Sequence, residues 1–328
     1  MTGLIDLKTI HSDGRHNAFT DIIHWKGYFY VSFRTAESHG IVPNGDIIII
    51  RSKDLVKWNK CSEIDTGGDD RDPKLINCGS FLGIVFGTWL PRRGGKSAVT
   101  NAEFDLISHI AMSKDGLMWS TPRQVYGMNY WLWRILPLDG IYLCAAYHFP
   151  VRSDRDKRSV HLLRSENLWD WEPLCLMRMG GGPGEPVLFE PEKGVLRCVI
   201  RSQEPQNHSF LGTSEAPYTS WCWTDLGVMI HAPVVLSVDD RWIVAGRSQR
   251  SDLPNDPGFS RDSNYGVSLW DITRETAEHL LTVPSGGDCS YCGLVRGIDE
   301  EILMTYYSQH ESKDSSSSDI FLASLAVG

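Results

Sequence analysis

The chain has 328 residues, of which 41% are hydrophobic and 22% are charged, and its formal net charge is −9. This composition is that of a globular protein with a large core, and the acidic balance argues against general nucleic-acid binding, which needs a basic surface. No stretch is long and apolar enough to span a membrane, and residues 1–20 lack the apolar centre of a signal peptide. We therefore expect a cytoplasmic protein without a nucleic-acid or membrane partner.

Short apolar runs separated by Gly, Pro, Asn and Asp predict β-strands, and no long segment keeps a helical period. Six units each predict a hairpin, in chain order 18–23 with 28–33, 73–76 with 81–86, 134–138 with 141–146, 186–189 with 195–200, 233–237 with 242–245, and 293–295 with 302–307. Four units also predict a third strand, at 47–50, 109–112, 160–163 and 320–323.

A motif of Ser, an acidic residue and Trp recurs about every fifty residues, which indicates a repeat architecture. Its copies lie at 52–58, 113–119, 165–171 and 214–221, with an eroded copy at 269–273. The sequence therefore predicts an all-β, single-domain protein over residues 1–328: a six-bladed β-propeller with four-stranded antiparallel blades. We expect the N-terminal residues to add an outer strand to the last blade, and one loop of every blade to surround a central hole.

These turns resemble the Asp box, or BNR repeat, of sialidase-like six-bladed propellers, and the copy at 113–119 keeps its Ser, Asp, Gly and Trp. We interpret the boxes as structural. A second resemblance concerns the site. Glu185, followed by Pro186, a strand, a Gly turn and a strand ending in Arg201, is similar to the blade-four glutamate region of sialidases, and Tyr291 is similar to their last-blade tyrosine.

The resemblance implies that Tyr291 is a nucleophile and Glu185 its base, in an exo-acting glycoside hydrolase that needs no cofactor and no metal. A phenol with a pKa near 10 is a weak nucleophile unless a carboxylate takes its proton. A neutral nucleophile also avoids repulsion from an anionic sugar. Tyrosine nucleophiles are the known exception to glycosidases that use two carboxylates.

The chain differs from the sialidase pattern in the position of its arginines. Sialidases begin blade one with an Arg-Ile-Pro strand whose Arg helps to hold the sugar carboxylate, whereas His16 to Asp21 contains no Arg. Arginines do recur at hairpin ends and first strands, and guanidinium groups suit carboxylates. The sequence thus predicts an anionic, carboxylated sugar or oligosaccharide as substrate, bound by Arg34, Arg71, Arg134, Arg201 and Arg247.

The acid/base residue is predicted from its position in the chain, with Glu37 and Asp72 as the candidates. Further substrate-binding candidates occupy the first strand of blade one or the loops and strands that end the hairpins. They are His16, Asp21, His39, His148, Tyr306 and His310.

Three alternatives remain open. Arg71-Asp72-Pro73 is similar to a motif of five-bladed fructosidase and arabinanase-type propellers, which would make Asp21 the nucleophile and Glu185 the acid. A polysaccharide lyase acting on uronates would use His or Tyr to remove a proton from the sugar. A non-catalytic carbohydrate-binding propeller would suit the missing first Arg.

Overall fold

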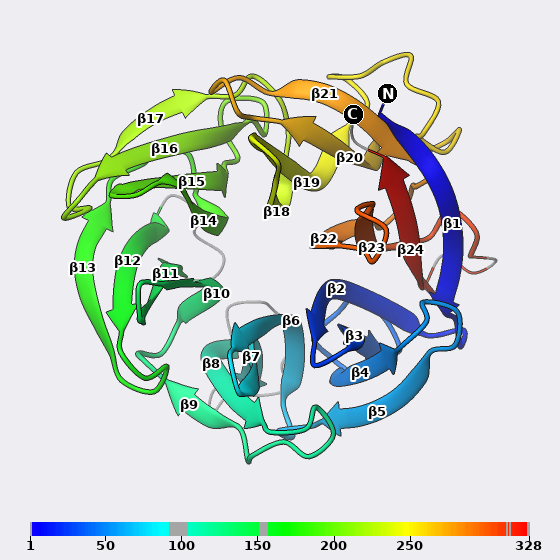
Figure 1. The fold of residues 1–328 in the computed structure, drawn as a ribbon, viewed down its shortest axis with the longest axis horizontal. Coiled ribbons are helices and arrows are strands. Elements are labelled where there is room, and N and C mark those ends of the chain that lie inside the picture. Colours follow the sequence, from blue (N-terminus) through cyan, green and yellow to red (C-terminus); the bar gives the residue numbers. More distant parts are fainter. Residues whose placement is uncertain (1, 92–103, 151–156, 313, 315, 327–328) are drawn as a thin grey trace.

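Six four-stranded antiparallel sheets surround a central axis in the computed structural model, as predicted (Figure 1). The structure describes residues 2–91, 104–150, 157–312, 314 and 316–326. Each sheet is one blade, and its first strand lies nearest the axis. The six sheets show that the five-bladed alternative is wrong. No helix in the described part of the chain has the length and hydropathy needed to cross a membrane.

The first three blades follow one another along the chain. Blade one contains β2 (His16–Trp25), β3 (Tyr28–Ala36), β4 (Asp46–Ser52) and β5 (Asn59–Ile64); blade two contains β6 (Asp69–Cys78), β7 (Phe81–Pro91), β8 (Phe104–Ser113) and β9 (Arg123–Val125); blade three contains β10 (Tyr130–Leu138), β11 (Ile141–His148), β12 (Ser159–Ser165) and β13 (Trp171–Met177). Every predicted strand of these blades is present.

The last three blades include the closure of the ring. Blade four contains β14 (Gly184–Glu192), β15 (Val195–Arg201), β16 (Ser209–Glu215) and β17 (Cys222–Asp225); blade five contains β18 (His231–Val238), β19 (Arg241–Gln249), β20 (Tyr265–Asp271) and β21 (Glu278–Val283); blade six contains β22 (Ser290–Arg296), β23 (Ile302–Ser308), β24 (Asp319–Ala326) and β1 (Gly3–His11). Strand β1 pairs antiparallel with β24, so both ends of the described chain belong to one blade, as predicted.

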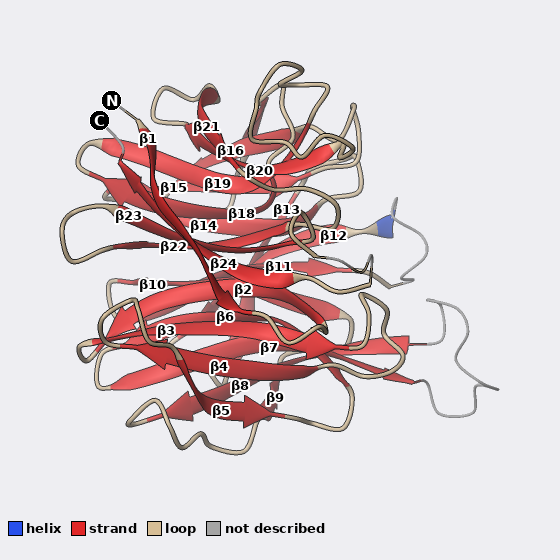
Figure 2. Cartoon of the chain, turned by 90° about the vertical axis from the view of Figure 1, so that its right-hand side faces the viewer, coloured by secondary structure: helices blue, strands red, loops and turns tan. Residues whose placement is uncertain are grey.

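The apolar core lies between neighbouring blades. One buried cluster, for example, joins Trp25, Tyr30 and Ile47 of blade one to Ile84 and Phe86 of blade two. Each blade therefore buries both of its faces against its neighbours, and the hydrophobic effect holds the ring together. In the side view most strands run side by side across the molecule, whereas the outer strand β1 crosses them steeply (Figure 2).

The Ser/acid/Trp turns of the first four blades join the third strand to the fourth. In the first copy, Asp54 Oδ1 accepts hydrogen bonds from Ser52 Oγ and from the amides of Val56 and Lys57, at 2.9–3.0 Å. Asp115 makes the same contacts in the second copy. In the third copy Asn167, rather than the acidic Glu166 beside it, accepts two amides at 2.8 and 2.9 Å. In these turns, side-chain oxygens accept the hydrogen bonds of backbone amides in the same turn, so the motif stabilises the turn itself.

Candidate active site

The first strand of every blade contains a β-bulge at the same place. In blade two, for example, Arg71 pairs with Gly87 and Lys74 with Val85, so Asp72 and Pro73 together face one residue, Phe86. The equivalent first residues of the six bulges are Phe19, Asp72, Trp133, Glu185, Ala232 and Tyr291. A bulge redirects a side chain out of the regular alternation of its strand. Blades one to six thus each turn one equivalent position toward the axis.

At five of these six positions, all except Trp133, the backbone is strained. Asp72, Glu185 and Tyr291 have φ values of 55°, 51° and 50°, and Phe19 and Ala232 also lie in the left-handed region. Non-glycine residues rarely adopt this conformation, which costs on the order of 1–3 kcal/mol each and concentrates at functional sites. Proline follows Asp72, Glu185 and Ala232, where its missing amide proton removes no ladder hydrogen bond.

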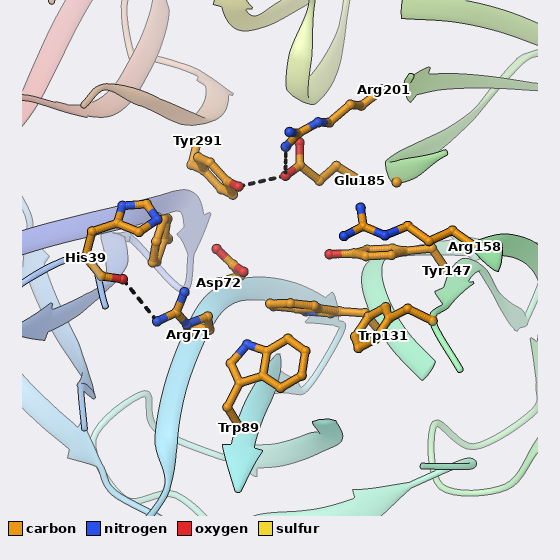
Figure 3. Close-up of a pocket in the computed structure, with 13 residues that line it drawn as sticks. His39, Arg71, Asp72, Trp89, Trp131, Tyr147, Arg158, Glu185, Arg201 and Tyr291 are labelled. Carbon is orange, nitrogen blue, oxygen red and sulfur yellow. Dashed lines mark hydrogen bonds and ion pairs between the residues drawn. The ribbon is translucent and has the colours of Figure 1, made fainter. Parts of the chain in front are cut away.

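A pocket of about 240 Å³ opens at the end of the central channel where the first strands begin (Figure 3). This volume is just below the usual range of small-molecule sites, about 300–1,000 Å³, and suits a single sugar unit. The lining residues come from every blade except the fifth. They are Phe19, His39, Arg71, Asp72, Trp89, Trp131, Tyr147, Phe149, Arg158, Gly184, Glu185, Arg201 and Tyr291.

Tyr291 and Glu185 form a direct pair inside this pocket. The Tyr291 hydroxyl donates to Glu185 Oε1 at 2.7 Å, and Arg201 Nη1 donates to the same oxygen at 2.7 Å. The other oxygen, Oε2, accepts the backbone amide of Ala232 at 2.8 Å. The carboxylate thus accepts three hydrogen bonds, two at Oε1 and one at Oε2, and the Glu185 side chain is only 7% exposed. The resemblance to sialidases implied this pair, and the structure brings the two side chains together.

The charge states of the pair follow from their surroundings. Burial opposes ionisation of Glu185, but Arg201, His231 and the Tyr291 hydrogen bond lower its pKa to about 2. Burial raises the pKa of Tyr291 well above its ordinary value, and the negative charges of Glu185 and Asp72 add to this effect. At neutral pH the pair is therefore a neutral phenol that donates to a carboxylate.

Asp72 lies across the pocket from this pair, in the equivalent bulge of blade two (Figure 3). It is 4% exposed, and its buried Oδ1 has no hydrogen-bond partner within the part of the chain that the structure describes. Burial raises its pKa to about 7, although Lys74 and Arg71 act in the opposite direction. A buried carboxyl that lacks donors and titrates near neutral pH is suited to acid/base chemistry.

Aromatic rings form the wall of the pocket opposite blade six. Trp131 and Tyr147 stack with centroids 5.6 Å apart, and Trp89 and Phe149 pack beside them. Such rings offer flat apolar surface to a ligand together with polar edges. Trp89, Trp131, Tyr147 and Phe149 were not among the predicted site residues. The alternation of Tyr147 and Phe149 at the end of an apolar strand was a signal that could have found them, since residues i and i+2 share a face.

Of the five predicted arginines, Arg71 and Arg201 line the pocket. Arg34 is fully buried behind it, where its guanidinium donates to Asp69 Oδ1 at 2.6 Å and to backbone carbonyls. Arg134 donates to Asp21 Oδ1 at 2.9 Å, below the pocket floor. Arg158, which was not among the predicted arginines, also lines the pocket, beside Gly184 and Tyr147.

The fifth arginine, Arg247, lies behind the Tyr291 ring, and its Nε donates to the Cys289 carbonyl at 2.8 Å. Its Nη2 approaches Tyr307 Oη at 3.2 Å and Asp288 Oδ1 at 3.3 Å. It therefore supports the blade-six side of the site from outside the pocket lining.

The other predicted site residues separate into two groups. His39 lines the pocket, and His16 lies behind it, 1% exposed, with Nε2 2.9 Å from Asp288 Oδ2. Four side chains point elsewhere. They are Glu37, which is exposed; His148, stacked on Tyr130; Tyr306, which donates to the Pro284 carbonyl; and His310, which bonds Ser308 Oγ.

Asp21 has a structural position in the channel wall. Its Oδ2 accepts the Leu75 amide at 2.8 Å, and its Oδ1 accepts a hydrogen bond from Arg134 Nη1. It does not line the pocket.

Comparison with known proteins supports the fold at low sequence similarity. No protein-family model and no curated protein matches the sequence. Among solved structures, a protein of unknown function from Dyadobacter fermentans superposes with a TM-score of 0.83 at 18% identity, and the match covers 100% of this chain and 99% of that one.

Two further structures belong to enzymes. Trypanosoma rangeli sialidase in complex with the inhibitor DANA gives a TM-score of 0.66 at 11% identity, covering 94% of this chain and 55% of that one. A Bombyx mori GH32 beta-fructofuranosidase gives 0.53 at 11% identity, covering 94% and 62%. The chain thus spans little more than half the length of the sialidase. Its fold resembles those of sialidase and GH32 glycosidases.

Proposed function

We propose that this protein is a glycoside hydrolase that removes an anionic sugar from the end of a glycan, with Tyr291 as nucleophile. The observation that carries the proposal is the 2.7 Å hydrogen bond from the Tyr291 hydroxyl to the buried Glu185 carboxylate, inside a pocket that also holds Asp72. A nucleophile within hydrogen-bond reach of a base that a third group orients is the expected arrangement, and Arg201 orients Glu185 here.

In the first step the Tyr291 oxygen attacks the anomeric carbon of the sugar. Because the phenol is far less acidic than Glu185, its proton moves to Oε1 only as the new C–O bond forms and makes the phenolic oxygen acidic. Asp72, protonated at and below neutral pH, gives its proton to the oxygen of the departing group as the glycosidic bond breaks. The product of this step is a sugar covalently bound to Tyr291.

In the second step a water molecule attacks the same carbon, and ionised Asp72 accepts its proton. The bond between the sugar and Tyr291 breaks, and Glu185 returns its proton to the phenolate. Two displacements at one carbon retain the configuration of the sugar. The left-handed backbone at Asp72, Glu185 and Tyr291 supports this assignment, since such strain is kept where a side chain must be held in a fixed direction.

The balance of charge in the pocket supports an anionic substrate. Three guanidinium groups line it, those of Arg71, Arg158 and Arg201, against the carboxyls of Asp72 and Glu185. The raised pKa of Asp72 reduces its negative charge near neutral pH. Arg158 and Arg201 stand on the same side of the pocket as Glu185 (Figure 3), and we assign the carboxylate of the sugar to them.

The test is a turnover assay with aryl glycosides of several carboxylated sugars and with uronate oligosaccharides. We expect release of the anionic monosaccharide. An Asp72→Asn variant should show a burst of aryl alcohol followed by a slow steady state, because an activated leaving group needs no acid whereas hydrolysis of the intermediate needs the base. Mass spectrometry should then find the sugar on the peptide containing Tyr291.

Two outcomes would contradict the proposal. An unsaturated product that absorbs ultraviolet light, without hydrolysis, would identify a lyase, in which Tyr291 removes a proton from the sugar ring. A folded protein that binds sugars but releases no product from any substrate would identify a carbohydrate-binding propeller.

A further inference from the structure

Three side chains that the proposed reaction does not use converge at the edge of the pocket between blades one and six. His16 Nε2 lies 2.9 Å from Asp288 Oδ2, and His39 Nδ1 lies 2.6 Å from the same oxygen. His16 begins β2, His39 belongs to the loop after β3, and Asp288 precedes β22. The three ligand atoms all lie within 4.8 Å of one another.

We propose that His16, His39 and Asp288 bind a divalent transition-metal ion of the Zn²⁺ type, with at least one coordination position open toward the pocket. Two imidazoles and one carboxylate are the ligand set of many three-residue metal sites, which leave the remaining positions to water or substrate. This inference departs from the expectation, drawn from the sequence, that the protein holds no metal.

The hydrogen bonds around the cluster leave the three ligand atoms available. Asp288 Oδ1 accepts the Tyr307 hydroxyl at 2.8 Å and faces Arg247 Nη2 at 3.3 Å, so these groups hold the carboxylate by one oxygen and leave Oδ2 to the two imidazoles. Hydrogen bonds to the second oxygen of a ligating carboxylate are a regular feature of metal sites. Among the described residues His16 Nδ1 has no hydrogen-bond partner, so a metal bound at Nε2 would leave the Nδ1 proton without an acceptor.

The geometry needs only a small adjustment. The present N···O distances are shorter than the ligand spacing of about 3.3 Å in a tetrahedral zinc site, so the rings would move outward by roughly half an ångström. His39 is 54% exposed and has room for this movement.

The open position lies beside Phe19, the bulge residue of blade one, whose ring is 5.4 Å from that of His39 and 4.8 Å from that of Tyr291. Phe19 contributes no charge to the pocket. A metal ion here would supply positive charge on the blade-one side, across from Arg158 and Arg201, and could bind an oxygen of the substrate. This role rests on the proposed function, whereas metal binding itself does not.

The test is titration of the purified full chain, stripped with a chelator, with Zn²⁺ by calorimetry, and with Co²⁺ by visible absorption. We expect one ion per chain and a cobalt spectrum typical of nitrogen and oxygen ligands. His39→Ala should weaken binding more than about 100-fold, because loss of an outer partner alone weakens metal sites about 10–100-fold. The matched control is His24→Ala, which removes an exposed histidine from the same strand as His16.

Absence of stoichiometric binding in the wild-type chain, or equal binding by His39→Ala, would overturn the inference. The same chain is then assayed with and without chelator. Metal binding without sugar release would leave the site standing and refute the hydrolase, whereas sugar release by a chain that binds no metal would refute the site alone. Because His39 is exposed, its replacement should leave the folded structure intact, and a thermal melt checks this.

Discussion

Tyr291 and Glu185 occupy the same bulge position in two different blades, and the hydroxyl of the first donates to the carboxylate of the second at 2.7 Å. The two residues are 106 positions apart in the chain. Their contact depends on the closure of the ring, since blade six is completed by β1 and stands next to blade one. The pair is therefore a product of the whole propeller and of no local segment.

Replacing either member of this pair should remove activity without unfolding the protein. We expect Tyr291→Phe to lower kcat by about 10³-fold or more, and Glu185→Gln to lower it by about 10²–10⁴-fold, the usual contribution of a general base. Steady-state kinetics on an aryl glycoside measures both. Tyr126→Phe, at a half-buried tyrosine outside the pocket lining, is the control and should retain full activity. If Tyr291→Phe kept the wild-type rate, Tyr291 would be excluded as the nucleophile.

The dependence of rate on pH should report Asp72. Because its pKa is raised to about 7, the protonated form needed in the first step is present below that pH and is lost above it. Glu185, with its pKa lowered to about 2, stays ionised throughout the usual range. We expect kcat/KM for a substrate with a poor leaving group to be constant at mildly acidic pH and to fall above about pH 7. In Asp72→Asn this fall should disappear along with most of the activity, and its persistence would point to another acid.

Arg158 should determine affinity for the charged part of the substrate. A charge-assisted hydrogen bond contributes about 1.5–3 kcal/mol, so Arg158→Ala should raise KM for a carboxylated sugar about 10–100-fold with a smaller change in kcat. The amide or methyl ester of the same sugar, which carries no charge, should bind the wild-type protein and Arg158→Ala with equal affinity. Arg164→Ala, an arginine of β12 paired with surface glutamates, serves as the control. An equal effect of Arg158→Ala on charged and neutral sugars would remove the basis for an anionic substrate.

The absence of a side chain at Gly293 allows the first strands of blades six and one to pack closely. A Cβ there would lie 2.4 Å from the amide nitrogen of Ile22 and 2.8 Å from the carbonyl carbon of Asp21, both backbone atoms. We expect Gly293→Ala to destabilise the fold by about 1–3 kcal/mol, the typical cost of overpacking, and to lower activity because Tyr291 precedes it on β22. Denaturant unfolding measures the change. Gly3→Ala, where a Cβ would meet nothing within 4 Å, should have little effect, and equal stability of the two variants would refute this account.

The sequence predicted the architecture because alternating apolar runs and turn residues mark strands. The central pair followed from a resemblance to sialidases, carried by Glu185-Pro186, the strand ending in Arg201 and the residues around Tyr291. The aromatic wall left only the alternation of Tyr147 and Phe149 as a signal, and Arg158 left none. Trp131 comes from the first strand β10, the other three aromatic residues come from the ends of second strands or just after them, and Arg158 directly precedes β12. They meet only because six blades converge on one axis. For the same reason the sequence did not show that Arg34 is buried against Asp69.

The repeated bulges separate the choice of chemistry from the maintenance of the fold. Since each first strand makes the same kink, exchanging the side chain at one kink leaves the backbone ladder of every blade unchanged, and a new reaction needs new residues at only a few points. Ala232 is the clearest case, because it contributes only a methyl group and an amide that binds Glu185. A substitution at this position would therefore add a functional group to the three that the bulges of Asp72, Glu185 and Tyr291 already supply.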